Sequence, residues 1–317
     1  MSAGAGGADS PVGVLVMHHG TPPALDEVPA FYTEIRRGSP PPPELLHDLV
    51  RRYQAIGGTS PLGARTAAQV AGMAARLRQL APGRFVVRHG ARFAEPRIEA
   101  AVAALAAAGA QRVVGLVLAP HSSVVSVGEY RRRATAAAAE VGGLEVEVVD
   151  HWHDSPGFAE LLAGRVRTAL GQLPDGRRTA ATVLFTAHSV PQRVVDAGDT
   201  YPEQVHRSAA AVAAAAGVPR WSVAWQSAGR TAEPWLGPDL LKVIAGLPEA
   251  GVTACVVCPI GFVSDHLEVL YDIDVEAAAA ARAVGLPLVR TSSLDDDPDF
   301  CDVLARVVLQ AAAWEAR

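Results

Sequence analysis

The segment LFTAHSVP, residues 184–191, is an apolar run that ends in a His-Ser pair, and LVLAPHSS, residues 116–123, has a similar pattern. Each apolar run predicts a buried strand, and each histidine falls where that strand would end. Five further apolar runs alternate with longer Ala-rich helical patterns; these runs are GVLVM, RFVVRH, LEVEVVD, WSVAW and TACVVCPI. Strands that alternate with helices favour βαβ units and a parallel sheet.

The strand candidates are too numerous for one small doubly wound sheet, so we predict two Rossmann-like halves. The expected N-terminal domain covers residues 11–150, and the expected C-terminal domain covers residues 151–317. The last helix is expected to pack back on the first domain. The opening residues, MSAGAGGADS, are small and polar, and we expect residues 1–10 to be disordered.

Composition excludes several classes of protein. The 317 residues are 50% hydrophobic, and the net charge is −5 without a basic stripe, so nucleic acid is not an expected partner. No segment offers about 18 uninterrupted apolar residues, so we expect no membrane insertion and a cytoplasmic location. Cys255 and Cys258 fall in a predicted strand, where residues three apart face opposite sides, which argues against a shared metal ion.

Histidines at predicted strand ends are the first candidates for chemistry. Ligands of open α/β sheets gather beyond the carboxyl ends of the strands, where His19, His121, His188 and His266 would lie. An imidazole there can accept a proton or bind a metal. It can equally be a histidine hydrogen-bonded at the start of a loop, and for His121 we favour that structural reading.

A row of carboxylates follows the last apolar run, in GFVSDHLEVLYDIDVEAAAA, residues 261–280. If this segment is a helix, Glu268, Asp272 and Glu276 share one face. The row is either a solvated helix face or a track of hard oxygen ligands for a partly hydrated divalent cation. A solvated face usually mixes charges of both signs, and this segment contains no Lys or Arg.

Two N-terminal blocks carry further candidates. Arg36 and Arg37 follow a helical pattern, and adjacent guanidinium groups are either surface charge or clamps for carboxylates. The block YQAIGGTSPL, residues 53–62, has the composition of a loop with special backbone needs. It lacks the glycine spacing of nucleotide-binding loops, so no organic cofactor or ATP is predicted.

Together these blocks resemble the ferrochelatases, which insert ferrous iron into a porphyrin. The resemblance covers roughly residues 12–309 and rests on LVMHHGTP, FYTEIRRG, YQAIGGTSPL, LAPHSS, TAHSVPQRVVDAGDTYPEQV, WQSAGRTAEPWLGPD and PIGFVSDHLEVLYDIDVE. It is nearest to the monomeric, cluster-free branch of Gram-positive bacteria, whose substrate is coproporphyrin III. It implies two parallel four-stranded sheets flanked by helices, the class II chelatase architecture.

The resemblance also implies roles for individual residues. The active-site histidine would be His188 and its carboxylate partner Glu268; both would serve in catalysis and contact the metal. Asp272 and Glu276 would lead Fe²⁺, the substrate, inward or hold a second divalent ion. Residues expected to bind or support the porphyrin are His19, Arg36, Arg37, Tyr53, Ser60 and Trp235.

The chain departs from the family pattern at one position near the metal. Where the cluster-free branch has a tyrosine before GTP, this chain has His19, preceded by His18. His19 could be an axial ligand of iron in the product, or it could shift the preferred metal toward cobalt, nickel or zinc. Alternatively, it is a tolerated ring of similar reach. Only Cys301 lies near the C-terminal end, so no iron-sulfur cluster is expected.

Two alternatives to a ferrochelatase stay open at this point. One is a chelatase for another divalent metal or another tetrapyrrole, for which His18 and His19 are the motive. The other is a non-catalytic haem or porphyrin carrier, or a paralogue recruited to other chemistry. The retained pair of His188 and Glu268 argues against the loss of catalysis, because a carrier would not need it.

Overall fold

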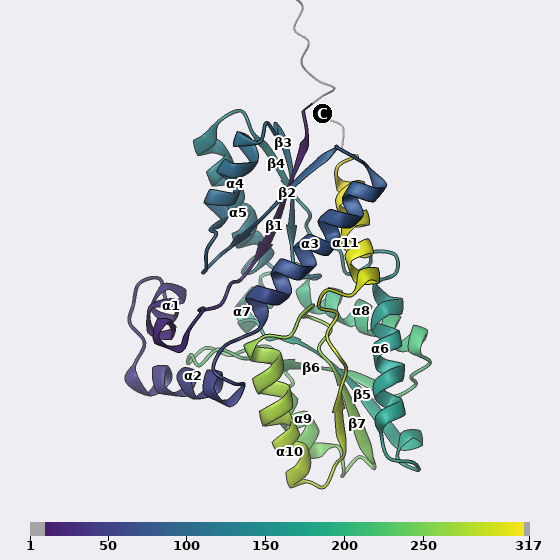
Figure 1. Cartoon of the computed structure of the whole chain (residues 1–317). Coiled ribbons are helices and arrows are strands. Elements are labelled where there is room, and N and C mark those ends of the chain that lie inside the picture. The colour runs from purple at the N-terminus through teal and green to yellow at the C-terminus, as the bar shows by residue number, and fades with distance from the viewer. Residues whose placement is uncertain (1–9, 314–317) are drawn as a thin grey trace, which may run out of the picture.

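The computed structural model of the protein describes residues 10–313, so the expected disorder of residues 1–10 lies almost wholly outside the described residues. The chain forms two parallel four-stranded sheets, with strand orders β2-β1-β3-β4 and β6-β5-β7-β8. Each sheet is flanked by helices (Figure 1). The prediction of two parallel α/β sheets is confirmed.

The first sheet is built by the N-terminal part of the chain. Its strands are β1 (Val12–His18), β2 (Phe85–Ala91), β3 (Arg112–Val117) and β4 (Glu145–Val148). Between β1 and β2 lie the 3₁₀ turn η1 (Leu25–Glu27) and the helices α1 (Val28–Ile35), α2 (Pro43–Ala55) and α3 (Leu62–Leu80). The helices α4 (Ile98–Ala107) and α5 (Val127–Val141) make the remaining crossovers.

The second sheet repeats this plan after helix α6 (Phe158–Gln172). Its strands are β5 (Ala181–His188), β6 (Trp221–Gln226), β7 (Ala254–Cys258) and the short β8 (Leu288–Arg290), which the sequence analysis missed. The intervening elements are η2 (Arg178–Ala180), α7 (Gln192–Asp196), α8 (Tyr201–Ala216), α9 (Leu240–Gly246), the π-helix η3 (Val269–Ala277) and α10 (Ala278–Ala283). The last helix is α11 (Pro298–Ala311).

Alternating side chains place the two faces of each sheet in different apolar cores. On β1, Val14 and Val16 join a core that reaches both sheets, whereas Leu15 and Met17 pack on the opposite face. Side chains of β5, β7, α6, α8 and α11 complete the shared core. The cysteines of β7 follow the same rule, as predicted: Cys258 lies in the shared core and Cys255 on the other face.

Helix α11 lies beside α3, next to the first sheet, although it follows the second sheet in the chain (Figure 1). An ion pair joins Arg76 of α3 to Asp302 of α11, and Arg84 donates a hydrogen bond of 3.0 Å to the carbonyl of Ala312. Because one core joins the sheets, the domain boundary near residue 150 stays a prediction.

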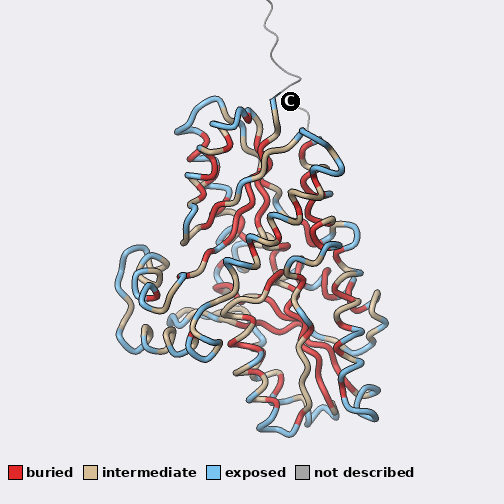
Figure 2. The backbone as a smooth tube through the Cα atoms, in the orientation of Figure 1, coloured by how far each residue is buried: buried red, intermediate tan, exposed pale blue. Residues whose placement is uncertain are grey.

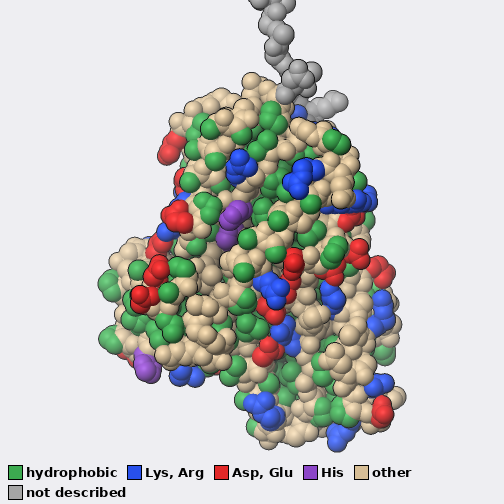
Figure 3. Space-filling model, in the orientation of Figure 1, with side chains coloured by type: hydrophobic (Ala, Val, Ile, Leu, Met, Phe, Trp, Pro, Cys, Tyr) green, Lys and Arg blue, Asp and Glu red, His purple; other side chains and the backbone are tan. Residues whose placement is uncertain are grey.

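Helices α1 and α2 stand apart from both sheets (Figure 1), and their residues are mostly exposed or half-buried (Figure 2). Val28 is the buried residue of α1, and Tyr53 is the buried residue of α2. Among residues 10–313, none of the helices has the length and apolar character that a bilayer crossing requires. On the face drawn in Figure 3, basic and acidic side chains are interspersed.

Candidate active site

The site lies where the strand order of each sheet reverses. In each sheet the first strand in the chain, β1 or β5, lies between the next two strands, so the chain crosses first to one side of it and then to the other. Open α/β sheets bind ligands at the carboxyl end of such a reversal point. His19 directly follows β1, and His188 ends β5. The similar segments LFTAHSVP and LVLAPHSS do not occupy equivalent places in the two sheets. His188 ends β5, whose counterpart in the first sheet is β1, whereas His121 follows β3.

Three histidines are held in the same way. The Nδ1 of His188 donates to the carbonyl of Ser189 (2.5 Å), that of His266 to the carbonyl of Ser264 (3.0 Å), and that of His19 to the carbonyl of Gly20 (3.1 Å). A carbonyl oxygen only accepts, so the proton of each neutral ring is on Nδ1. The Nε2 lone pair of each ring is therefore left for a proton or a metal.

Two of these rings lie close to the carboxylate of Glu268. The Nε2 of His188 is 3.7 Å from Oε1 of Glu268, and the Nε2 of His266 is 3.8 Å from Oε2. Tyr201 donates a hydrogen bond of 3.1 Å to the carbonyl of His188, which fixes the backbone at the end of β5. The structure therefore brings His188 and Glu268 together, as the sequence analysis expected.

The surrounding charges push the pKa values of these groups apart. Burial by itself would raise the pKa of Glu268, but His188, His266 and His19 lower it to about 2. Desolvation lowers the pKa of His19. Burial also acts to lower the pKa of His266, but the nearby carboxylate of Glu268 outweighs it and raises that pKa. Near neutral pH, Glu268 is ionised and His19 is a neutral imidazole.

Asp272 and Glu276 of the acidic row lie in the π-helix η3, and Glu268 directly precedes it. Asp272 is 6% exposed and accepts hydrogen bonds from Ser227 and, at 3.4 Å, from the side chain of Gln226. Desolvation and repulsion from Glu268 raise the pKa of Asp272 to about 6. A π-helix within a helical segment often marks a functional site.

A cation from a distant element partly neutralises the row, which the sequence analysis did not foresee. Nη1 of Arg52, on α2, lies 3.3 Å from Oδ1 of Asp272, and its Nη2 lies 3.8 Å from Oε1 of Glu276. The same guanidinium pairs with Asp48 at 2.8 Å and lies over the ring of Tyr271 at 4.8 Å. The row is therefore neither a freely solvated face nor a bare track of carboxylates.

The two other carboxylates of this segment have structural partners. Arg290 on β8 forms ion pairs with Asp274 at 2.7 Å and with Asp265 at 3.0 Å. Ser293 donates a further hydrogen bond of 2.6 Å to Asp265. These contacts separate Asp265 and Asp274 from the row and tie the π-helix to the edge strand of the second sheet.

The residues expected at the porphyrin lie around this centre at different depths. The ring of Trp235 is 6.5 Å from that of His188, and the hydroxyl of the buried Tyr53 is 3.4 Å from that of Thr21. Ser60 accepts a hydrogen bond of 3.3 Å from the amide of Leu62, so its hydroxyl serves the start of α3.

Arg36 and Arg37 directly follow α1 and have no carboxylate partner among residues 10–313. The Nε of Arg36 donates to the carbonyl of Ser39 (3.3 Å), and Arg37 is exposed with a φ of 57°. His19 is partly open to solvent but packs beside two aromatic rings, with centroid distances of 4.9 Å to Phe93 and 6.0 Å to Phe31, and loss of water around its ring is the cause of its lowered pKa. The Cζ of Arg36 lies 5.9 Å from the centroid of the Tyr32 ring of α1.

The sequence analysis missed two residues of the site. His266 was noted at a strand end but not placed beside Glu268, although it is two residues away in the same block. Arg52 directly precedes Tyr53, yet nothing in the order of residues showed that α2 would reach the π-helix. The first omission was avoidable, whereas the second required the tertiary structure.

The fold is similar to that of solved chelatases. The sirohydrochlorin chelatase SirB from Bacillus subtilis subspecies spizizenii, solved in complex with cobalt, has a TM-score of 0.60 at 12% identity, with 96% of each chain covered. A multi-domain protein from Deinococcus radiodurans with structural similarity to chelatases gives a TM-score of 0.58 at 14% identity; the match covers 96% of this chain and 56% of that one. At these identities the likeness shows the fold alone.

The sequence comparison is more specific. The ferrochelatase family model matches residues 11–312, and the chain therefore belongs to the ferrochelatase family. A coproporphyrin III ferrochelatase from Geobacillus thermodenitrificans is 42% identical, covering 97% of this chain and 98% of that protein. The coproporphyrin III ferrochelatase of Bacillus subtilis is 41% identical over 94% and 97%, and a ferrochelatase of Herpetosiphon aurantiacus is 41% identical over 93% and 97%.

Proposed function

We propose that the protein inserts Fe²⁺ into coproporphyrin III to give iron coproporphyrin, a step of haem synthesis. The proposal rests on membership of the ferrochelatase family and on the names of the relatives at 41–42% identity. The observation that carries it is the pair of His188 and Glu268, 3.7 Å apart, with His266 holding the second carboxylate oxygen.

The reaction replaces two pyrrole N–H protons with one Fe²⁺, so the site must accept protons and admit a dication. A carboxylate with a pKa of about 2 is a weak proton acceptor near pH 7, so we assign proton acceptance to His188. Glu268 then stabilises the imidazolium that forms. Its charge also attracts the metal, and its low pKa keeps that charge present throughout the reaction.

The acidic row supplies the approach for the metal. Asp272 and Glu276 face one guanidinium, that of Arg52, which a divalent ion can displace because both contacts are 3.3 Å or longer. We propose that Fe²⁺ passes along this row to Glu268, and that a second divalent ion can rest at its outer end. Carboxylate oxygens suit such partly hydrated ions.

The porphyrin would lie against His19, Phe31 and Trp235, with its propionates near Arg36 and Arg37. Two features favour this placement: both arginines lack a carboxylate partner within residues 10–313, and α1 presents half-buried apolar side chains. Tyr53 and Ser60 would support the wall through Thr21 and the start of α3. We further propose that the protein acts as a monomer in the cytoplasm.

Insertion of a different metal is the second candidate function, and His19 favours it. A neutral imidazole with a free Nε2 is a stronger ligand than a phenol for cobalt, nickel or zinc. Desolvation lowers the pKa of His19, which keeps the ring neutral. His19→Tyr should then shift the ratio of iron to cobalt insertion toward iron, whereas an unchanged ratio would remove His19 as a determinant of the metal.

The deciding experiment is anaerobic metallation of coproporphyrin III and protoporphyrin IX with Fe²⁺, followed by absorption spectroscopy. We expect insertion into coproporphyrin III by the wild type. In His188→Ala, insertion should collapse while porphyrin binding persists. A wild-type protein that binds porphyrin tightly and never metallates it would be a carrier, and one that inserts cobalt but not iron would be a different chelatase.

A further inference from the structure

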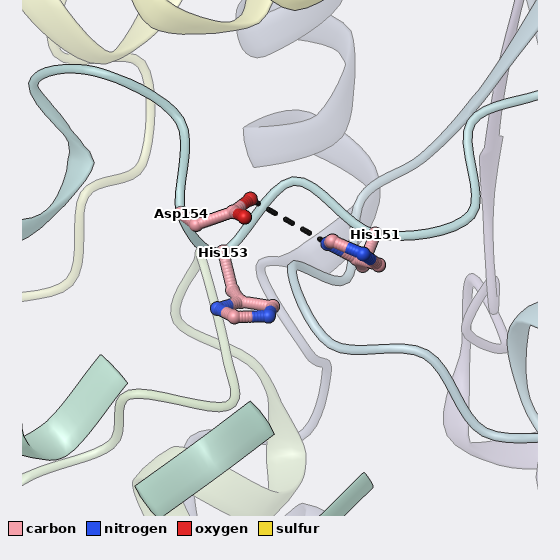
Figure 4. Close-up of side chains that lie close together, drawn as sticks. All are labelled: His151, His153 and Asp154. Atoms are coloured by element: carbon pink, nitrogen blue, oxygen red, sulfur yellow. Dashed lines mark ion pairs between the residues drawn. The ribbon is translucent and has the colours of Figure 1, made fainter. Parts of the chain in front are cut away.

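A group of metal-ligating side chains lies outside the proposed active site, on the connection between β4 and α6. His151, His153 and Asp154 each offer one ligand atom, and these atoms lie within 4.8 Å of one another. Figure 4 shows the two rings and the carboxylate gathered at one loop. The proposed insertion reaction uses none of these three residues.

Two buried nitrogens in this group lack a hydrogen-bond partner. His153 is 4% exposed; its Nδ1 bonds to the hydroxyl of Ser208 at 3.1 Å, and its Nε2 is buried without a partner. The Nδ1 of His151 is likewise buried and makes no hydrogen bond. Native structures satisfy nearly all buried polar atoms, and an ion is one of the groups that satisfy the remainder.

The spacing suits one small cation. Nδ1 of His151 lies 3.5 Å from Oδ1 of Asp154. Two ligands about 2.1 Å from one tetrahedral ion are separated by roughly 3.4 Å, so this pair already has the spacing of a shared ion. The remaining separations are at most 4.8 Å, so they exceed this spacing by no more than about 1.4 Å, and the side chain of Asp154, which is 66% exposed, is free to adjust around an ion.

A second layer of contacts orients the buried ring. The hydroxyl of Ser208 on α8 lies between Nδ1 of His153 and Nε2 of His121, at 3.1 and 3.0 Å. It can accept a hydrogen bond from Nδ1–H of His153 and donate one to Nε2 of His121, which leaves Nε2 of the neutral His153 ring unprotonated. Metal-bound histidines are usually fixed through their other nitrogen in this way. His121 also stacks on His153, with centroids 5.3 Å apart.

We propose that His151, His153 and Asp154 bind one divalent first-row ion of borderline softness, such as Zn²⁺ or Co²⁺. Two imidazoles and one carboxylate favour such ions over Mg²⁺ and Ca²⁺, which prefer all-oxygen sites. The three protein ligands leave a position open for water on the side of the exposed Asp154. The ion ties the link between the two sheets to α8 through Ser208, and it is not the ion that enters the porphyrin.

The test uses the full chain without a histidine tag, carrying His188→Ala and Glu268→Gln to weaken the insertion site. Zn²⁺ titration calorimetry on this parent should find one site that Asp154→Ala or His151→Ala weakens by more than about tenfold. Asp175→Ala, which removes another exposed carboxylate, is the matched control and should bind as the parent does. Unchanged affinity in either ligand variant would overturn the proposal.

Two further measurements separate a ligand role from a folding role. Co²⁺ bound to the parent should give visible absorption bands of a low-symmetry site, and Asp154→Asn should abolish these bands while keeping the circular dichroism of the parent. Ser208→Ala should retain one bound ion with about 10- to 100-fold weaker affinity. Bands that persist in Asp154→Asn would show that Co²⁺ binds elsewhere and refute the site.

Discussion

Replacing Asp272 by asparagine measures what it costs to ionise a carboxyl group inside the acidic row. Asp272 is 6% exposed, and desolvation followed by repulsion from Glu268 raises its pKa from 3.8 to about 6. Arg52 and Ser227 lower the pKa and only partly offset these effects. The native state therefore holds this proton more tightly than the unfolded chain does.

The size and sign of the effect follow from the two pKa values. As pH rises above 3.8 the unfolded chain loses the proton first, so the free energy of unfolding falls until about pH 6 and the penalty stays at higher pH. The shift of about 2 units, at 1.36 kcal/mol each, corresponds to about 3 kcal/mol. Asparagine does not titrate. The free energy of unfolding of Asp272→Asn, measured relative to that of the wild type, should therefore rise by about 3 kcal/mol between pH 4 and pH 7.

Urea denaturation of both proteins across this pH range measures the difference directly. The interactions of Ser227 and Arg52 with the ionised carboxylate are already contained in the native pKa of about 6, so the pH dependence of the difference reports that pKa. Asp196→Asn, at an exposed position of α7, controls for the general effect of removing a charge. A difference that stays flat, or that falls as pH rises, would refute the assigned pKa and its cause.

Three other variants probe the site and its support. Glu268→Gln should lower insertion by about 10²- to 10⁴-fold without loss of porphyrin binding, and rates within tenfold of wild type would contradict its role. Arg52→Gln frees the row from its competing cation, so the KM for Fe²⁺ at pH 8 should fall by roughly two- to fivefold; an increase would mean that Arg52 organises the row instead. Arg290→Met leaves Asp265 and Asp274 unpaired and should cost about 3 kcal/mol of stability by denaturation, with kcat unchanged; a loss of kcat at full stability would contradict a structural role.

Periodicity and local composition predicted most of the fold. Apolar runs bounded by turn residues marked β1 and β5, whose side chains alternate between two apolar cores, and this alternation also placed Cys255 and Cys258 on opposite faces. Strand β8 was missed because Leu288–Arg290 is short and only half-buried. The last helix was expected to pack back on the first domain, but the core shared by the two sheets was not predicted, because no local pattern encodes contacts between residues so far apart in the chain.

The candidate site likewise contains residues that the sequence could predict and residues that only the tertiary structure brings in. Strand ends placed His188 and His19 correctly because the carboxyl ends of parallel strands converge, and the resemblance to the ferrochelatases added Glu268. Charge counting along one segment failed for the acidic row, because its counter-ion, Arg52, comes from α2. The similarity of the LAPHSS block to TAHSVP suggested that the two halves of the chain repeat each other at these histidines. The topology does not have this repeat, because local sequence does not determine the order of strands in a sheet.

The π-helix η3 makes the metal row sensitive to chain length in a way that its composition does not reveal. Its backbone bonds run from residue i to i+5, so removal of one residue would let the segment relax to an α-helix with better hydrogen-bond geometry. The tighter α-turn would compensate for the missing residue, so later side chains would keep roughly their present side. Winding to an α-helix with every residue kept would instead turn Asp272 and Glu276 progressively away from Glu268 and Arg52, because each residue of an α-helix advances by about 100°, more than in the wider π-turn. The present direction of the row therefore depends on the match between the number of residues and the π-helical winding.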